Sequence, residues 1–279
     1  MKNIFFLFFS FSSLILRAQY FYTDIVGTLQ TNKQMQIYNA NKVLRVSASG
    51  VDPAGRRTTD FSELQEIKEN GKALKISTFN NLNKTVYYNR FDEQGRLTSI
   101  IDSSFAVQST TTYEYDNNGR VVLVKNVIND TANDFNQTEI HKWIYNPDGT
   151  PLKMWRTINN ADSLEVRFTA DEHGNAGDEK TYKRGIETGV VYYYYDDKKR
   201  LTDIVRYNTK AKKLLPDMMF EYDDQDRIIQ KITTTSSLNL SYLIWRYLFD
   251  DKGLKTKEAL FNNDKELTGK IEYSYTFGQ

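Results

Sequence analysis

Aromatic and polar positions alternate through most of the chain, and short polar segments interrupt the alternation at regular intervals. Residues 113–121 show the pattern most clearly, with the order Tyr-Glu-Tyr-Asp-Asn-Asn-Gly-Arg-Val. Two aromatic residues at positions i and i+2 lie on the same side of a strand, because strand side chains alternate between two faces. The pattern therefore predicts antiparallel strands joined by short hairpin turns.

The polar segment has the chemistry of a hairpin turn. The carboxylate of Asp116 can accept hydrogen bonds from backbone amides further along the turn. Gly119, three positions later, can adopt positive φ without a steric penalty. Val121 then begins the returning strand.

The same sequence motif recurs along the chain at intervals of 24 to 30 residues. The positions equivalent to Asp116 are Asp92, Asn146, Asp171, Asp196, Asp223 and Asp250. Two degenerate copies, around Lys68 and at Tyr38-Asn39, extend the series toward the N-terminus, and residues 273–275 supply a final aromatic strand. Self-similarity at a fixed period indicates a repeat array.

Two of the predicted turns lack glycine at the position equivalent to Gly119. Lys199 and Asp226 occupy the glycine position of their repeats. Positive φ is unfavourable for residues with a Cβ, and least so for Asp and Asn. We expect these two turns to differ in shape from the others.

The predicted fold is all-β, with tandem antiparallel hairpins in one long twisted sheet. Open sheets of more than about ten strands tend to curl or split, so roughly eighteen strands predict an open spiral or half-barrel. Residues 60–68 carry conflicting patterns, because Asp60 and Glu63 resemble a helix capping pair while the repeat register predicts a strand. The strand is favoured.

The first residues differ from the rest of the chain. Lys2 precedes an apolar run over residues 4–15, and Ala18 ends the segment. This is the pattern of a secretory signal peptide, predicted to be cleaved after residue 18. A membrane anchor is disfavoured, since spanning a bilayer needs roughly 20 apolar residues. Residues 19–37 are then a lead-in, and residues 38–279 form the array as a single domain.

Composition narrows the function classes. The chain has 39% hydrophobic residues and no cysteine, which predicts a folded protein without disulfides, thiol catalysis or cysteine-bound metals. Without Lys2 and Arg17, 35 basic residues remain against 36 acidic ones. Such a balance disfavours nucleic acid as a partner. No later segment resembles a transmembrane helix, so a soluble or surface-attached exported protein is predicted.

The repeated Tyr-Asp-x-x-Gly-Arg-Leu phrase resembles the YD repeats of the Rhs/YD-repeat family over residues 38–277. The resemblance implies antiparallel sheets that spiral, in some members around a cavity that holds a toxic domain. This chain is short, and it lacks both a non-repeat C-terminal effector and the family's self-cleavage region. Residues 52–55, Asp-Pro-Ala-Gly, echo part of that region but are interpreted as a plain turn. The chain is similar to small exported YD-repeat proteins of Gram-negative bacteria.

Exposed aromatic residues are the main candidates for a binding surface. Residues 192–195 are four consecutive tyrosines, which must point to both faces of a strand. We predict an aromatic binding surface that includes Tyr192, Tyr194, Trp143 and Tyr247. The competing and favoured interpretation is that cross-strand aromatic pairs only stabilise the sheet.

No catalytic residue, metal site or cofactor is predicted. His141 and His173, the two histidines, have no partners at metal-ligand spacing. Calcium needs about six to eight oxygen ligands, whereas most of the repeated turns offer one or two carboxylates. The repeated Asp residues are therefore interpreted as turn-closing groups.

Two function classes remain. The first is a non-enzymatic exported protein of the bacterial cell envelope, periplasmic, cell-surface or secreted, that binds glycan or protein partners or acts as a scaffold. The second is an envelope hydrolase that cleaves a polysaccharide with two carboxylates in a cleft. The sequence singles out no such pair of carboxylates, which favours the first class.

Overall fold

The computed structural model describes residues 20–81, 83–103, 107–234 and 241–279, so the predicted signal segment lies outside the described residues. The described residues form one α-helix, α1 (Thr23–Ala40), a 3₁₀ turn η1 (Glu69–Gly71) and eighteen strands. The strands are β1 (Val43–Val51), β2 (Arg57–Lys68), β3 (Ala73–Asn80), β4 (Asn83–Phe91), β5 (Leu97–Asp102), β6 (Val107–Tyr115), β7 (Val121–Asp130), β8 (Phe135–Tyr145), β9 (Pro151–Ile158), β10 (Asp162–Ala170), β11 (Ala176–Lys183), β12 (Ile186–Tyr195), β13 (Leu201–Asn208), β14 (Lys213–Tyr222), β15 (Ile228–Thr234), β16 (Tyr242–Phe249), β17 (Lys255–Phe261) and β18 (Leu267–Phe277).

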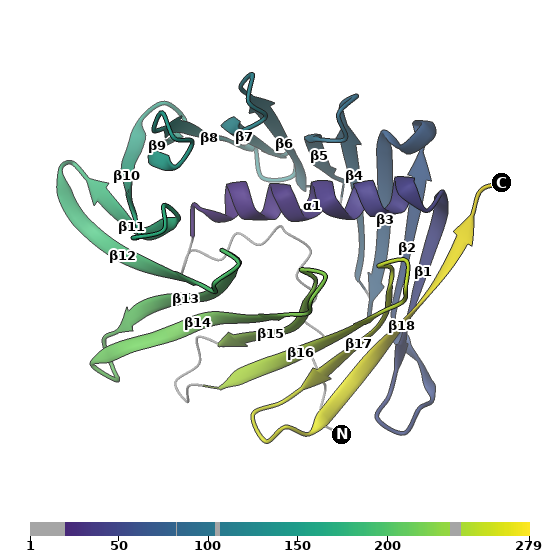
Figure 1. Cartoon of the computed structure of the whole chain (residues 1–279). Coiled ribbons are helices and arrows are strands. Elements are labelled where there is room, and N and C mark those ends of the chain that lie inside the picture. Colours follow the sequence, from purple (N-terminus) through teal and green to yellow (C-terminus); the bar gives the residue numbers. More distant parts are fainter. Residues whose placement is uncertain (1–19, 82, 104–106, 235–240) are drawn as a thin grey trace.

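The sheet closes into an 18-stranded antiparallel barrel (Figure 1). Each strand pairs with the next strand of the chain, and β18 pairs with β1. The prediction of an all-β hairpin array is confirmed, but the open spiral or half-barrel is wrong. Closure pairs the backbone groups of the first and last strands, which an open sheet would leave exposed at its two edges.

The seven predicted turns are confirmed, and they all lie at one end of the barrel. In the clearest copy, Asp116 Oδ1 accepts hydrogen bonds from the amides of Asn118 and Arg120, each at 2.9 Å. The amide of Gly119 donates to the Asp116 carbonyl at 3.0 Å, and Gly119 has φ +77°. The Asp116 amide also donates to the Arg120 carbonyl at 2.9 Å, and these two backbone hydrogen bonds recur at all seven positions.

The turns at Lys199 and Asp226 do not differ in shape, contrary to the prediction. Lys199 adopts φ +60° and Asp226 φ +57°, and both form the same backbone hydrogen bond as the glycines. The Asp side chain and the strand pairing on either side hold the turn in one geometry, which the non-glycine residue then adopts despite its Cβ.

A second set of contacts links each hairpin to the next. The Tyr145 hydroxyl donates to the Val121 carbonyl of the preceding repeat at 2.7 Å. The guanidinium of Arg120 lies 4.6 Å from the centre of the Tyr145 ring, within cation–π range. Tyr115 makes the equivalent contacts with Leu97 and Arg96. The tyrosine before Asp and the arginine after Gly therefore recur because they join adjacent repeats.

We expect Tyr145→Phe to lower the free energy of unfolding by about 1 kcal/mol, because one half-buried hydrogen bond between repeats is lost. Urea denaturation measures the change. Tyr88→Phe is the matched control, since Tyr88 is 40% exposed on the outer wall. Equal effects of the two substitutions would contradict a stabilising role for the contact between repeats.

Three expectations from the sequence concern the N-terminal part of the structure. Residues 60–68 belong to β2, as the repeat register favoured, and β2 pairs with β1 and β3 along its length. Residues 52–55 form a plain hairpin turn between β1 and β2. Tyr38 and Asn39, predicted to begin the array, instead lie in α1.

Helix α1 lies across the interior near the end that carries the seven turns (Figure 1). Asn32 accepts a hydrogen bond from the Leu97 amide at 2.8 Å, and Lys33 donates to the Asp226 carbonyl at 3.1 Å. The helix is therefore attached to turns from distant parts of the chain. None of the described helices is both long and apolar enough to cross a membrane.

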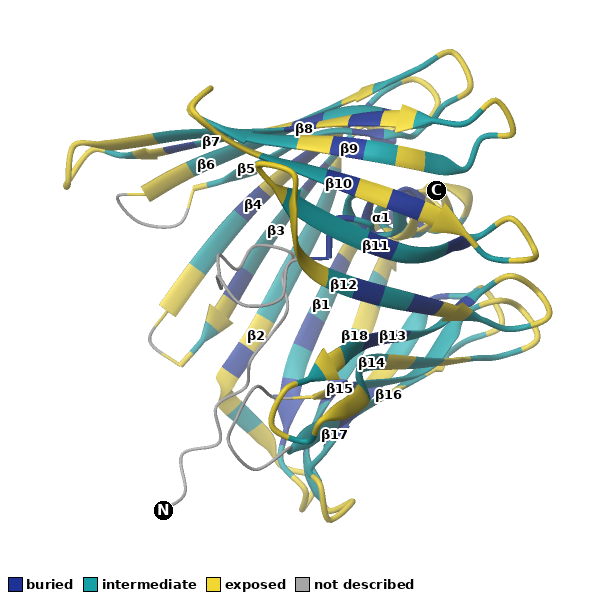
Figure 2. Cartoon of the chain, turned by 90° about the vertical axis from the view of Figure 1, so that its left-hand side faces the viewer, coloured by how far each residue is buried: buried dark blue, intermediate teal, exposed yellow. Residues whose placement is uncertain are grey.

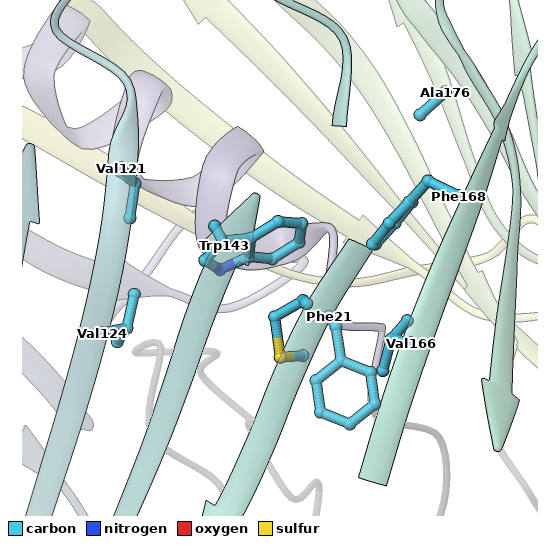
Figure 3. Packing of buried hydrophobic residues seen from close by; sticks show 8 residues of the cluster. Phe21, Val121, Val124, Trp143, Val166, Phe168 and Ala176 are labelled. Atoms are coloured by element: carbon cyan, nitrogen blue, oxygen red, sulfur yellow. The ribbon is translucent and has the colours of Figure 1, made fainter. Parts of the chain in front are cut away.

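The described residues form four clusters of buried side chains, and residues 20–40 contribute to three of them. Phe21 packs with Trp143 and Phe168 in the first cluster (Figure 3). Met35 belongs to the second and Tyr20 to the third. An 18-stranded barrel is too wide for its wall side chains alone to fill, so the N-terminal segment supplies the remaining apolar surface. Figure 2 shows buried positions alternating with exposed ones along the strands.

A buried network of charges fixes the start of α1 to the wall. His141 lies between two carboxylates, with Nδ1 2.7 Å from Asp24 Oδ2 and Nε2 2.8 Å from Glu139 Oε1. Arg156 donates two hydrogen bonds to Glu139, at 2.7 and 2.9 Å. Trp143 Nε1 also donates to Asp24, at 3.1 Å. We call Asp24, Glu139, His141 and Arg156 the His141 network.

The network favours a protonated imidazole. Burial alone would lower the pKa of His141, but the charges and hydrogen bonds of Asp24 and Glu139 outweigh burial and raise this pKa to about 9. Burial would raise the pKa of Glu139, but His141 and Arg156 lower it to about 2. His141 is therefore a structural cation between α1 and β8.

A second anchor precedes the helix. Glu179, 1% exposed, accepts hydrogen bonds from the amides of Phe21 and Tyr22 at 3.2 and 3.0 Å. The Tyr193 hydroxyl donates to the same carboxylate at 2.7 Å. Burial raises the pKa of Glu179. The segment before α1 is thus held to β11 and β12 through its backbone.

Candidate functional site

The four aromatic residues predicted from the sequence lie on two faces of the wall. Tyr193 is buried and bonded to Glu179 inside the barrel, so Tyr192 and Tyr194 point outward by strand alternation. Trp143 and Tyr247 point inward. The four residues therefore do not form one surface.

The two inward residues are packing groups. Trp143 is 4% exposed and donates its indole hydrogen bond to Asp24. Tyr247 is half-buried opposite Glu258, with Lys255 Nζ 4.9 Å from its ring centre, and burial raises its pKa. Both agree with the interpretation that aromatic residues stabilise the sheet.

The two outward tyrosines belong to an exposed apolar area on β12, β13 and β14. Tyr194 is 49% exposed, and its neighbours across the sheet include Asp203 and then Met219. Tyr207, 57% exposed, lies opposite Leu214. We call Tyr192, Tyr194, Tyr207, Leu214 and Met219 the outer tyrosine patch. Large apolar side chains gathered on a surface often mark an interaction site.

A hollow of about 580 Å³ lies at this part of the wall. Its lining residues are Thr181, Gly189, Val190, Val191, Tyr192, Arg206, Tyr207 and Leu214. Gly189 leaves space because it has no side chain, and the register of β11 against β12 shifts between Thr181 and Tyr182. Such a bulge locally bends a strand and interrupts its ladder. The volume is within the range of small-ligand sites.

An acceptor group lies beside the patch. Asp178 is directly opposite Tyr192 in the sheet. Within the part of the chain that the structure describes, its buried Oδ1 atom has no hydrogen-bond partner. Buried polar atoms are normally paired, so this atom is an exception, and its burial means that a ligand would reach it only after neighbouring side chains move.

The barrel interior contains the carboxylates closest to the alternative hydrolase hypothesis. Glu63 accepts hydrogen bonds from Gln65 and Thr78 at 2.7 and 2.9 Å. Burial, together with the charge of Glu258, raises the pKa of Glu63. Glu258 Oε1 contacts Lys255 Nζ at 2.5 Å and accepts a hydrogen bond from Tyr273. Both carboxylates are thus engaged by neighbouring side chains.

Neither histidine has the surroundings of a metal ligand. His141 belongs to the buried network, and the side chain of His173 is 67% exposed in its turn. Among the described residues, no group of three or more His, Cys, Asp or Glu side chains is arranged to hold a metal ion.

The sequence singled out two of the five residues of the patch. Alternation in the tyrosine run singled out Tyr192 and Tyr194, whereas Tyr207, Leu214 and Met219 were missed. Their exposure depends on which face of β13 and β14 points into the barrel. Alternation alone does not say which face that is.

Comparison with known proteins supports the repeat. A family model described as the RHS repeat matches residues 91–127. These residues contain the turns at Asp92 and Asp116 and the strands between them. No curated protein matches the chain.

Solved structures show weak likeness. A porin-like protein from Bacteroides uniformis matches with a TM-score of 0.44 and 11% identity, over 84% of this chain and 98% of that chain. The TcdB2-TccC3-Cdc42 complex matches with a TM-score of 0.35 and 13% identity, over 80% of this chain and 12% of that chain. The Tc holotoxin pore of Photorhabdus luminescens matches with a TM-score of 0.31 and 12% identity, over 82% of this chain and 15% of that chain. This chain therefore spans a small part of the toxin chains.

Proposed function

We propose that this chain, whose match to the RHS repeat model over residues 91–127 is consistent with an Rhs/YD-repeat protein, is an exported, non-enzymatic protein that binds glycan chains at its outer tyrosine patch. The observation that carries the proposal is the exposure of Tyr194 and Tyr207 beside a hollow in the barrel wall. The repeat itself is accounted for by turn closure and contacts between repeats. The patch is not needed for either.

Three properties of the patch suit a sugar. Exposed tyrosine rings offer apolar faces with a polar hydroxyl at the edge. Sugar rings have matching apolar faces and outward hydroxyl groups. The Asp178 carboxylate, 18% exposed and opposite Tyr192, would receive a hydrogen bond from one of those hydroxyls at its accessible oxygen.

The hydrolase alternative has less support. A glycosidase needs one carboxyl group free to protonate the leaving group and another to act as base or nucleophile. Glu63 and Glu258 are engaged with Gln65, Thr78, Lys255 and Tyr273. Both side chains are inside the barrel, on the opposite face of the wall from the patch.

The test is the triple variant Tyr192→Ala, Tyr194→Ala and Tyr207→Ala, measured on a glycan array and then by titration calorimetry with the sugars that bind. We expect affinity to fall at least tenfold, because stacking surface is removed at the centre of the site. Tyr88→Ala is the matched control, since it removes an exposed tyrosine from the outer wall of β4.

Unchanged glycan affinity in a folded triple variant would overturn the proposal, as would the absence of binding by the wild-type chain. If the chain released reducing ends from a bound polysaccharide and Glu63→Gln abolished this release, the hydrolase hypothesis would replace the glycan-binding proposal. Capture of peptides but not glycans on arrays would assign the patch to a protein partner.

A further inference from the structure

Three adjacent strands next to the patch place basic residues directly opposite one another on the outer wall. Lys153 of β9 pairs with Arg167 of β10, and Arg167 pairs with Lys180 of β11. Lys180 in turn lies opposite Val190, which lines the hollow. We call Lys153, Arg167 and Lys180 the basic row. Neighbouring strands are about 4.8 Å apart, so the row spans about 10 Å and leads to the hollow.

The row lies on the outer face. Val166 and Phe168, on either side of Arg167, are buried in the interior, and the side chain of Arg167 is 54% exposed. Met154, next to Lys153, is fully buried. The interior positions thus alternate with the three basic positions.

Two carboxylates partly balance the row. Arg167 donates a hydrogen bond to Glu165 at 2.8 Å, and Lys180 Nζ lies 3.9 Å from Asp178. Like charges directly opposite in a sheet are destabilising. Three cations with two carboxylates therefore leave an excess of positive charge, which a bound anion would neutralise.

Aromatic rings accompany the cations. The Arg167 guanidinium lies 4.4 Å from the centre of the Tyr182 ring, and Lys153 Nζ lies 5.8 Å from that of Trp155. Trp155 is 37% exposed. Cations and exposed rings thus occur together along the row, and they continue into the tyrosines of the patch.

We propose that the basic row extends the outer tyrosine patch and selects glycans that carry carboxylate groups, such as chains of uronic acids. This inference rests on the proposed glycan-binding function and adds the charge of the ligand. Aromatic rings contact the sugar faces, while the row pairs with the carboxylates. A polynucleotide fits less well, because Glu165 and Asp178 lie within the same area and the whole chain is nearly neutral.

The experiment compares polygalacturonate, a polymer of uronic acid, with dextran, a neutral glucose polymer, in affinity electrophoresis of the full chain. We expect wild-type protein to bind polygalacturonate more tightly and to lose this preference at high salt. Lys153→Gln with Lys180→Gln should weaken polygalacturonate binding about three- to tenfold at low salt, as the loss of two exposed ion pairs predicts. Dextran binding should not change.

Lys68→Gln with Lys257→Gln is the control, because it removes the same charge from exposed sites on β2 and β17. Equal affinity for both polymers, unchanged by the Lys153 and Lys180 substitutions, would overturn the acidic-glycan inference while leaving the proposed function intact. A failure of the proposed function is distinct, because neither polymer nor any arrayed glycan would then bind the wild-type protein. Binding of a single-stranded oligonucleotide in preference to polygalacturonate would also overturn the inference.

Discussion

His141→Ala is expected to lower the free energy of unfolding by about 3–5 kcal/mol, the range found when one partner of a buried ion pair is removed. The imidazole is 8% exposed and bridges Asp24 of α1 to Glu139 of β8. Alanine leaves the Asp24 carboxylate buried with Trp143 Nε1 as its remaining described side-chain donor. The cost arises from uncompensated charge and from the cavity that the ring leaves.

Urea denaturation of the purified chain measures this effect, and the second histidine provides the control. His173→Ala removes a side chain that is 67% exposed in a turn, so its effect should stay within about 0.5 kcal/mol. A loss of less than about 1 kcal/mol in His141→Ala would show that the buried network does not stabilise the docked helix.

The turns were predictable because their causes are local. Asp116 and Gly119 determine the turn through contacts within five residues, so the sequence signal and the structural cause coincide. Lys199 shows the limit of this reasoning. Its intrinsic preference argues against positive φ, but the flanking hydrogen bonds impose it.

Closure of the barrel and the position of α1 have non-local causes. Pairing of β1 with β18 joins residues more than 200 positions apart, and no short motif records it. Helix α1 is polar on several faces, since Asn32 and Lys33 bond to the wall and Asp24 to His141. A sequence search for an apolar stripe does not find such a helix.

Only Tyr192 and Tyr194 of the candidate site were predictable, for a related reason. A run of four tyrosines must alternate between faces, so either Tyr192 with Tyr194 or Tyr193 with Tyr195 had to point outward. The contact of Tyr193 with Glu179, which holds the N-terminal segment, decides between them. Trp143 points inward for the same reason, because Asp24 lies inside the barrel.

Stability should also fall as the solution becomes alkaline. The pKa of His141 is raised from 6.5 to about 9 in the folded chain, chiefly because Asp24 and Glu139 outweigh the effect of burial. A group that binds its proton more tightly when folded stabilises the fold fully below its unfolded pKa. That contribution is lost as the pH rises through the folded pKa. The difference between the two pKa values corresponds to about 3 kcal/mol.

Urea denaturation from about pH 6 to about pH 9.5 tests this expectation, provided that other titrations are subtracted. The curve of the His141→Ala variant supplies the contribution of the other groups, because Lys231 and the buried tyrosines are present in both proteins. Wild-type stability should decline across this range more steeply than that of the variant, and the gap between the two curves should narrow toward the alkaline end, leaving the cost of the cavity. Parallel curves would mean that folding leaves the pKa of His141 unchanged. Above that pKa the neutral ring would then hold α1 by hydrogen bonds alone, without the charge that Asp24 and Glu139 attract.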